Sequence, residues 1–226
     1  MTSNDRNLAN RLRITTQGMH RTAEQSGLMQ RLLRGQVNAA EYAWMLRNLH
    51  ALYTSLETAL DRHASNPEIA PVRISVLYRT AALVDDLRQF QGPHWQNLPL
   101  TTAIRNYVAR LEEISLTAPA LLVAHAYVRY LGDLSGGQLL GKLIRRSFEL
   151  PAHAGTAFYD FGDSGQADLL KEQFRNALNG LPATPDVADA IVREAGSAFE
   201  RHVALFAELD QSAQIETQGS MPPPAA

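Results

Sequence analysis

Three glycines, Gly132, Gly136 and Gly137, interrupt a segment that otherwise predicts one long helix, from about Thr117 to Phe148. Each interior glycine destabilises a helix by about 1 kcal/mol relative to alanine, so the three together cost roughly 3 kcal/mol of a domain stability of about 5–15 kcal/mol. Glycines four apart leave one face of a helix without side chains. Such a face suits either a close helix–helix crossing or a bound ligand, and the neighbouring acid Asp133 favours a ligand site.

His20 is the histidine whose neighbours suggest metal binding. It lies near the end of an expected amphipathic first helix that includes Leu8 and Leu12, and Glu24 follows four residues later. A carboxylate at that spacing can accept a hydrogen bond from one ring nitrogen and leave the other nitrogen free to bind a metal ion. Such pairs also occur simply as helix-end caps. His125, inside an apolar run, indicates a buried core histidine. The other histidines show no comparable partner: His50, His63, His94, His153 and His202.

Two further groups of polar residues are candidates for a functional site. Lys171 and Arg175 are four apart on one expected helix and project from the same side. Together with Arg13 they would suit a ligand that bears two carboxylates, although their spacing is also typical of a solvated helix face. A second group interrupts apolar helical faces, and because buried polar groups need partners it could form one network able to hold ordered water. Its members are Tyr53, Tyr107, Arg129 and Asp133.

Helices must position these residues, because no alternating strand pattern or fixed repeat is present. The expected helices after the first cover about residues 38–63, 74–90, 101–114, 117–148, 167–178 and 184–209. Proline and glycine pairs separate them, and an ordered loop is expected over 151–165. The pattern predicts an all-α fold with a single domain at residues 1–210. A polar, disordered tail is expected over 211–226.

The composition excludes several classes of protein. The 226 residues include no cysteine, which removes disulfides, iron–sulfur clusters and thiol nucleophiles. A net charge of −2 gives no support to nucleic-acid binding. No apolar stretch approaches the roughly 20 residues that span a bilayer, and no secretory signal is evident. We therefore expect a cytoplasmic protein without a membrane anchor.

The segment Ala120–Gln138 closely resembles the signature of haem oxygenases. The resemblance extends from about Leu8 to Leu209 and includes His20–Glu24 and Ala198–Phe206. The run Thr156–Tyr159 resembles the soluble bacterial type. The resemblance implies an all-α fold in which haem lies between a proximal helix and a kinked distal helix.

The resemblance also implies a role for each candidate residue. His20 matches the axial iron ligand, and Glu24 matches the acid that orients it. Gly132 and Gly136 match the distal glycines whose backbone approaches the haem face. Asp133 matches the acid that organises the distal water network. The other members of that network would be Tyr53, Arg129 and Tyr107.

The remaining matches concern the edges of the haem. The groups expected near the propionates are Arg13, Tyr127, Lys171 and Arg175, and the aromatic wall would be Phe199 and Phe206. Relatives commonly have lysine at the first of these positions. Arg13 is therefore a departure that keeps the positive charge and changes its contact geometry.

The implied reaction opens haem b to biliverdin and releases carbon monoxide and ferrous iron, with dioxygen and electrons consumed. Haem would be both cofactor and substrate. We expect a monomer that takes electrons from a ferredoxin or a flavoprotein reductase, with the basic patch Lys142, Arg145 and Arg146 as a candidate docking surface. The α meso carbon is the family's default point of attack.

Three rival classes are a non-catalytic haem carrier or sensor, a carboxylate-bridged di-metal protein and a helical hydrolase with a cysteine nucleophile. The absence of cysteine excludes the hydrolase. The carrier or sensor is the main alternative: it would keep His20 and the glycines but has little need for Asp133 with Arg129 and the tyrosines. The di-metal class requires paired Glu-x-x-His motifs, which the sequence lacks.

Overall fold

Helices dominate the part of the chain that the computed structural model describes, residues 7–151 and 154–219, and no strand occurs within these ranges. The α-helices are α1 (Leu8–Glu24), α2 (Gly27–Leu33), α3 (Ala39–Arg62), α4 (Thr80–Gln91), α5 (Thr102–Thr117), α6 (Leu122–Ala126), α7 (Gly132–Ser147), α8 (Ser164–Asn179) and α9 (Pro185–Gly219). Short turns connect them: η2 (Ala70–Val72), η3 (Ser75–Leu77), η4 (Gly92–Asn97), η5 (Pro119–Leu121), the π turn η6 (Tyr127–Leu131) and η7 (Ala157–Tyr159). The expected all-α fold is confirmed.

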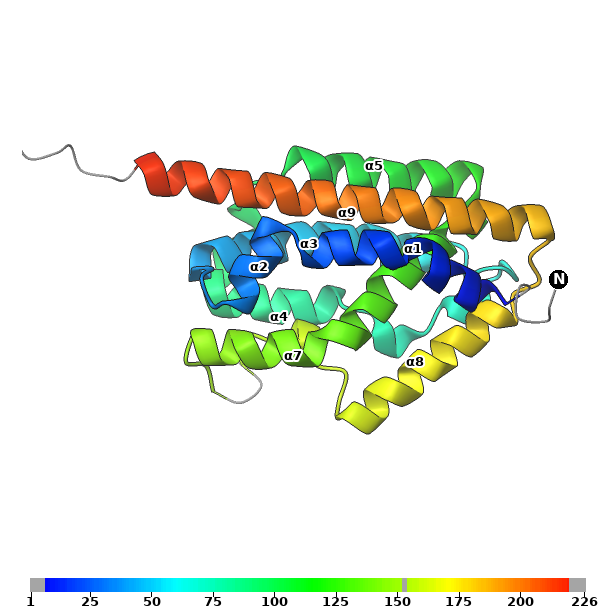
Figure 1. Ribbon diagram of the computed structural model, residues 1–226, viewed down its shortest axis with the longest axis horizontal. Coiled ribbons are helices and arrows are strands. Elements are labelled where there is room, and N and C mark those ends of the chain that lie inside the picture. Colours follow the sequence, from blue (N-terminus) through cyan, green and yellow to red (C-terminus); the bar gives the residue numbers. More distant parts are fainter. Residues whose placement is uncertain (1–6, 152–153, 220–226) are drawn as a thin grey trace, which may run out of the picture.

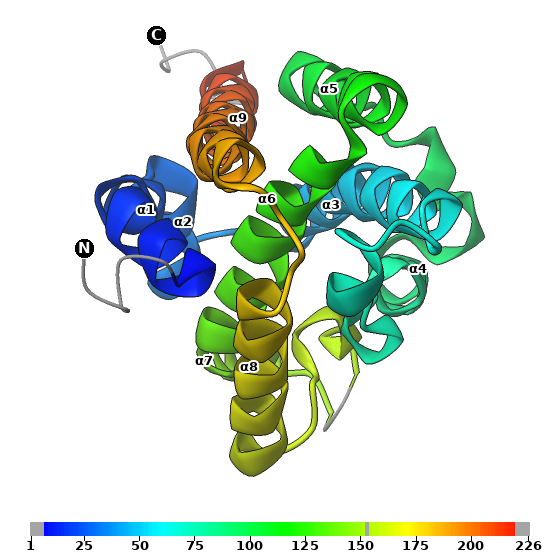
Figure 2. The same ribbon diagram turned by 90° about the vertical axis from the view of Figure 1, so that its right-hand side faces the viewer.

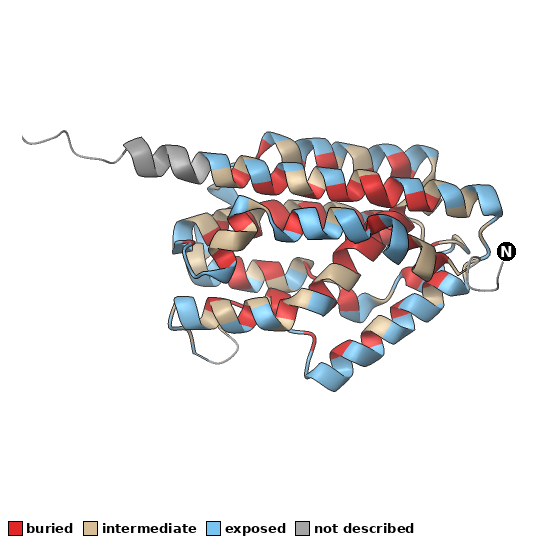
Figure 3. Cartoon of the chain, viewed as in Figure 1, coloured by how far each residue is buried: buried red, intermediate tan, exposed pale blue. Residues whose placement is uncertain are grey.

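The long helix α9 runs the length of the molecule and packs against α1 and α5 (Figures 1 and 2). Helix α3 packs against α4 and α5. The short α6 passes through the centre, where it contacts α3, α5 and α9, and every one of its residues is buried (Figure 3). The core therefore surrounds α6, directly before the segment that carries the glycines. None of the helices in the described ranges is both long and apolar enough to cross a membrane.

Side-chain caps fix where several helices begin. Asn38 accepts a hydrogen bond from the Glu41 N–H, and the Glu41 carboxylate accepts one from the Asn38 N–H, both at 2.9 Å. This reciprocal pair is the capping box that the sequence predicts at the start of α3. Asn7 caps α1 in the same way, by accepting from the Asn10 N–H at 3.0 Å. The register of α1, and with it the place of His20, follows from this cap.

The predicted long helix over Thr117–Phe148 is confirmed from Pro119 to Ser147, where helical turns follow one another without a gap, but it begins two residues later and is not a uniform α-helix. Helix α5 ends at Thr117, and Ala118 is not helical, as expected of a residue that precedes a proline. Pro119 then starts η5, and α6 follows. The π turn η6 comes directly before Gly132. A π turn inside a helix changes its direction, so α7 leaves the core at an angle to α6 (Figure 2).

The predicted helix over 74–90 begins later, at Thr80. The Arg79 guanidinium donates to the carbonyls of Val76, Leu77, Tyr78 and Asp160 at 2.8–3.1 Å, which occupies groups that a helix would need. The buried Glu57 carboxylate then accepts from the Arg79 and Thr80 N–H groups and caps α4. Local periodicity could not predict this break, because Glu57 and Asp160 are distant in the sequence.

Helix α8 also begins inside the expected 151–165 loop, at Ser164, after the Asp163 cap. Helix α2 was not predicted. Helix α9 continues past the expected end at Leu209 to Gly219, so residues 211–219 of the expected tail are helical. The rest of that tail, residues 220–226, lies outside the described residues.

Asp86 on α4 holds the turn that supports α7. Its carboxylate is buried and accepts hydrogen bonds from the Ala157 and Phe158 N–H groups at 2.8 and 2.9 Å. Tyr159, the next residue of η7, packs behind α7. An ideal Cβ placed on Gly141 would lie 3.2 Å from Tyr159 Cβ. The carboxylate therefore positions α7 indirectly, through Tyr159.

Asp86 also predicts a pH dependence of stability. Burial raises the pKa of this carboxyl from 3.8 to about 6, although its two N–H partners oppose the rise. The folded protein therefore binds a proton there that the unfolded chain releases, so the contribution of Asp86 to stability is present in acid and is lost as the pH rises through about 6. We expect the unfolding free energy of the wild type, relative to Asp86→Asn, to fall by about 3 kcal/mol between about pH 3 and pH 7.

Urea unfolding of both proteins across this range measures the difference. The exposed neighbour provides the control, since Asp85→Asn should show no such trend. Parallel pH profiles for the wild type and Asp86→Asn would contradict the assignment.

Candidate active site

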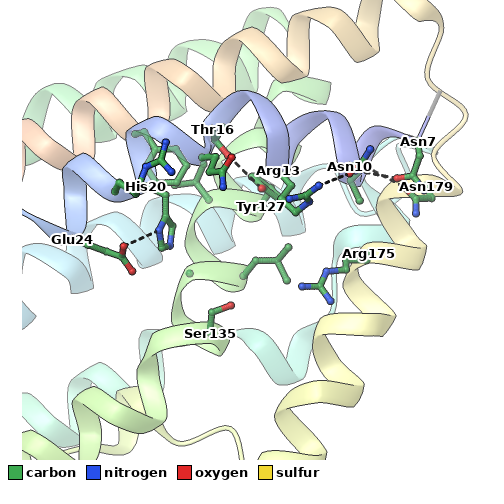
Figure 4. Close-up of a pocket in the computed structure, with 17 residues that line it drawn as sticks. Asn7, Asn10, Arg13, Thr16, His20, Glu24, Tyr127, Ser135, Arg175 and Asn179 are labelled. Atoms are coloured by element: carbon green, nitrogen blue, oxygen red, sulfur yellow. Dashed lines mark hydrogen bonds and ion pairs between the residues drawn. The ribbon is translucent and has the colours of Figure 1, made fainter. Parts of the chain in front are cut away.

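A cleft runs between α1 and α7. It consists of two adjoining cavities of about 640 and 520 Å³. The residues that line both cavities are His20, Glu24, Val128, Gly132, Ser135 and Phe199. Figure 4 shows the first cavity, with His20 on the α1 side, Ser135 on the α7 side and Arg175 projecting from α8. Helices far apart in the sequence therefore build one site.

His20 extends into this cleft from α1 (Figure 4). It continues the buried stripe of α1 formed by Leu12 and Thr16, each four residues before the next. Its ring Nδ1 lies 3.4 Å from a Glu24 carboxylate oxygen, and the edge of the ring meets Phe199 at a centroid distance of 6.1 Å. The histidine side chain is 46% exposed. Because Glu24 is beside Nδ1, the other nitrogen, Nε2, is the one available to a ligand.

The glycine face of α7 is uncovered toward the cleft. An ideal Cβ placed on Gly132 or Gly136 would meet nothing within 4 Å, and both residues line the cleft. A close helix–helix crossing, the alternative interpretation of these glycines, is therefore wrong for this pair. Gly137 differs from them, because a Cβ there would lie 3.5 Å from Tyr159. The third glycine thus packs against η7.

Three of the four predicted polar residues form one buried cluster at the cleft. Arg129 donates from Nε to the Tyr53 hydroxyl at 3.0 Å and from Nη2 to Asp133 Oδ1 at 2.9 Å. The Tyr53 hydroxyl donates to the other Asp133 oxygen. Burial raises the pKa of the Asp133 carboxyl, while Arg129 and Tyr53 act in the opposite direction. The cluster can therefore hold a proton-accepting carboxylate out of bulk water.

Tyr107 belongs to a different network. Its hydroxyl lies 3.0 Å from His125 Nδ1, and His125 Nε2 lies 3.0 Å from Glu194. Arg110 donates twice to the Glu194 carboxylate, at 3.0 and 2.7 Å. The expectation of a single network that includes Tyr107 is thus corrected, because its hydroxyl reaches α6 and the Glu194 system. The interpretation of His125 as a buried, hydrogen-bonded core residue is confirmed.

His202 also belongs to the cleft cluster, although no spacing in the sequence indicated this. One guanidinium nitrogen of Arg129, Nη1, lies 3.1 Å from both ring nitrogens of His202. The ring packs on Phe206 at 4.1 Å between centroids. Since Arg129 is 73 residues away, no local spacing could have indicated this contact.

Two of the three predicted cations line the first cavity. Arg13 and Arg175 both border it, as does Tyr127, whose hydroxyl is 3.4 Å from Thr16 Oγ1 (Figure 4). Lys171 is not among the lining residues, and its ammonium donates to Asp168 at 2.9 Å on the same helix. The expected cationic trio is therefore a pair of arginines, since an ion pair within α8 occupies Lys171.

The chemistry of this cleft fits haem. One cavity is lined by three arginines that could pair with carboxylates, Arg13, Arg21 and Arg175. The other has aliphatic and aromatic walls that include Met29, Leu33 and Phe206. An imidazole borders the cleft on the α1 side. On the α7 side the absence of side chains at two glycines leaves room that a flat ligand can occupy. A large planar ring with two acidic groups and a central metal ion matches all of these features.

The glycine face predicts opposite effects of one substitution at two positions. Gly136→Leu should raise the stability of the ligand-free protein by about 0.5–1 kcal/mol, because leucine favours a helix and its Cβ meets nothing. It should weaken haem binding about tenfold or more, because the side chain fills the cleft. Urea unfolding and haem titration measure the two effects.

Gly141→Leu provides the matched control. Its Cβ would press on Tyr159, so stability should fall by about 1–3 kcal/mol. A destabilised Gly136→Leu protein that binds haem like the wild type would contradict the interpretation of this face.

Comparisons with known proteins agree with this geometry. The family model described as Heme oxygenase matches residues 6–208. The chain is 38% identical to Heme oxygenase 1 of Homo sapiens over 218 aligned residues. The aligned region covers 95% of this chain and 76% of the human protein. The crystal structure of heme oxygenase-2 from Synechocystis sp. PCC 6803 in complex with heme and NO is similar at a TM-score of 0.88 and 37% identity, over 96% of this chain and 95% of that one. The corresponding structure of heme oxygenase-1 from the same cyanobacterium, in complex with heme, gives a TM-score of 0.85 at 35% identity, over 96% and 100%. Because the similarity covers almost the whole chain and includes the helices that form the cleft, this protein belongs to the haem oxygenase family.

Proposed function

We propose that the cleft between α1 and α7 is where this protein opens the haem ring to biliverdin, with release of carbon monoxide and ferrous iron. The protein is an enzyme that degrades haem, which is its substrate as well as its cofactor. The observation that carries the assignment to this cleft is the pairing of His20 with the uncovered face at Gly132 and Gly136. When bound, haem supplies the iron that activates dioxygen and the ring that is oxidised.

On the α1 side, His20 would hold the iron through Nε2. Glu24 supports this role, because a carboxylate 3.4 Å from Nδ1 fixes the orientation and tautomer of the ring. A neutral imidazole ligand, unlike a thiolate, donates little electron density toward cleavage of an O–O bond. The proximal side therefore suits oxidation of the ring itself.

On the α7 side, Asp133 would hold and return a proton. Its carboxylate is buried and accepts two hydrogen bonds, one from Tyr53 and one from Arg129, and Arg129 also donates to the Tyr53 hydroxyl. A carboxyl whose pKa is raised by burial can take up a proton more readily than one in water. The bare glycine face leaves space for a small co-substrate next to this group. Tyr107 would act less directly, by fixing His125 in the core.

The edges of the cleft would orient the substrate. Arg13 and Arg175 would bind the two propionates. Tyr127, the first residue of the π turn, would lie near them, with its hydroxyl against Thr16 of α1. Lys171 would reach a propionate only after it leaves Asp168. Phe199 and Phe206 would form the aromatic wall.

Residues 1–210 would form one catalytic domain, acting as a monomer in the cytoplasm. A ferredoxin or a flavoprotein reductase would donate electrons at the basic patch of Lys142, Arg145 and Arg146, where Arg145 also donates to Thr156 at 2.7 Å. A non-catalytic carrier or sensor is the weaker candidate, because it has no use for a buried proton-holding cluster at the cleft.

Asp133→Ala should keep haem binding and lose ring opening, with turnover falling about 10²–10⁴-fold. The Soret band measures binding, and the appearance of bilin absorbance with reductant in air measures turnover. Asp133→Asn keeps most of the hydrogen bonds and should lose activity to a similar extent, which separates proton transfer from folding. Asp85→Ala, at an exposed acid on α4 away from the cleft, is the control and should behave like the wild type. Normal biliverdin yield from Asp133→Ala would exclude this role.

His20→Ala should shift and weaken the Soret band, because the proposed iron ligand is removed. Added imidazole should restore the spectrum in part, since the small ring can occupy the space left on α1. His94→Ala, which alters an exposed histidine of η4, should leave the spectrum unchanged. An unaltered Soret band in His20→Ala would remove His20 as the ligand.

A further inference from the structure

Two methionines lie in the wall of the second cavity of the cleft. Met29 of α2 and Met45 of α3 both line this cavity, which is also bordered by Asp133, Gly132 and Gly136. Met45 is 3% exposed, so it is shielded from the outer surface, and the cavity is the space that it borders. Two thioether side chains therefore lie beside the space that the glycines leave open.

Packing alone does not require sulfur at these positions. Met45 and Leu49 lie one turn apart on α3 and line the same cavity, and leucine fills a methionine site at little cost in stability. A thioether differs from leucine in its chemistry, because its sulfur is polarisable and peroxides oxidise it to the sulfoxide. The chain has no cysteine, and no tryptophan is among the described residues that line this cavity. The methionines are therefore the side chains of this wall that peroxide oxidises most readily.

Met19 provides a comparison within the same chain. It is partly buried, as Met29 is, but it lines neither cavity of the cleft. Its side chain packs on α9, where an ideal Cβ on Gly196 would lie 3.6 Å from the sulfur. The effect of lining the cleft can therefore be separated from the effect of being a methionine.

We propose that Met29 and Met45 are sites of oxidative modification, converted to methionine sulfoxide by hydrogen peroxide that forms in the cleft. This inference rests on the proposed function, which brings dioxygen and electrons to this space. Dioxygen that takes up two electrons and two protons without oxidising the haem ring becomes hydrogen peroxide. The sulfur then gives an electron pair to one peroxide oxygen, and the O–O bond breaks. The other oxygen takes the proton of the first and leaves as water, so the sulfur is oxidised by two electrons.

The modification would weaken the protein's hold on its substrate. A sulfoxide is polar, so it fits poorly against the apolar part of the haem. Haem affinity should fall about fivefold or more, the effect of burying a polar group without a partner. A methionine sulfoxide reductase should restore the affinity, because it returns the sulfoxide to the thioether.

Peptide mass spectrometry after turnover tests the proposal. The protein receives haem and ascorbate in air, with catalase in solution to remove any peroxide that leaves the cleft. Met29 and Met45 should each gain an oxygen atom, to an extent about fivefold or more above that at Met19. The control is hydrogen peroxide added without haem, where the equally accessible Met19 and Met29 should be oxidised alike.

Three results would overturn the proposal: equal oxidation of Met19, Met29 and Met45 after turnover, the turnover pattern reproduced by added peroxide without haem, or oxidation that catalase prevents. The Met29→Leu/Met45→Leu variant gives a second readout, the haem affinity before and after turnover. The wild type should lose affinity relative to its unreacted form, whereas the variant should keep its own starting value. An equal loss in both proteins would exclude the two sulfurs as the cause.

Failure of the proposed function has a different signature. A wild-type protein that forms no bilin under these conditions would remove the proposed function itself. Failure of the methionine proposal alone leaves biliverdin formation intact, with both sulfurs unoxidised.

Discussion

The site depends on keeping one face of α7 uncovered while the helix is held firmly from behind. A helix with glycines at 132, 136, 137 and 141 has little stability of its own, since each glycine gives up about 1 kcal/mol. Tyr159 supplies the missing support by packing against Gly137 and Gly141, and Asp86 holds the turn that carries Tyr159. The glycines therefore divide into two pairs: one opens toward the ligand, and the other allows close packing of the supporting turn.

The buried cluster around Arg129 is the second feature that links structure and chemistry. Its members come from α3, η6, α7 and α9, so the cluster ties four elements together at the cleft. A buried ion pair contributes little net stability, because the desolvation of both charges offsets their attraction. Its presence is better explained by function, since a carboxylate and an imidazole are held at fixed positions away from bulk water. The second buried network, from Tyr107 through His125 to Glu194, joins α5, α6 and α9 instead and has a structural role.

The two halves of the cleft differ in polarity, and under the proposed function this difference would orient the substrate. Arg13 and Arg175 border one end, whereas the other end has aliphatic and aromatic walls. A haem whose propionates faced the arginines would place its apolar edge against those walls and its centre beside His20. In that arrangement Arg13 and Arg175 would set which way the ring enters, and the glycine face would set how closely the chain approaches it.

The sequence by itself determined the helical fold class, the cap of α3 and the glycine face, because each depends on residues a few positions apart. It also placed Glu24 beside His20 for the same reason. Only the tertiary structure decided which polar residues meet. Tyr53, Arg129 and Asp133 converge, Tyr107 turns to His125, Lys171 pairs with Asp168, and His202 enters the cleft. The break before Thr80 likewise depends on long-range hydrogen bonds, and the π turn within the helix over 119–147 lies in the buried core. Periodicity reports which face of a helix is buried, but the partner that a buried polar group finds there is set by the packing of distant helices.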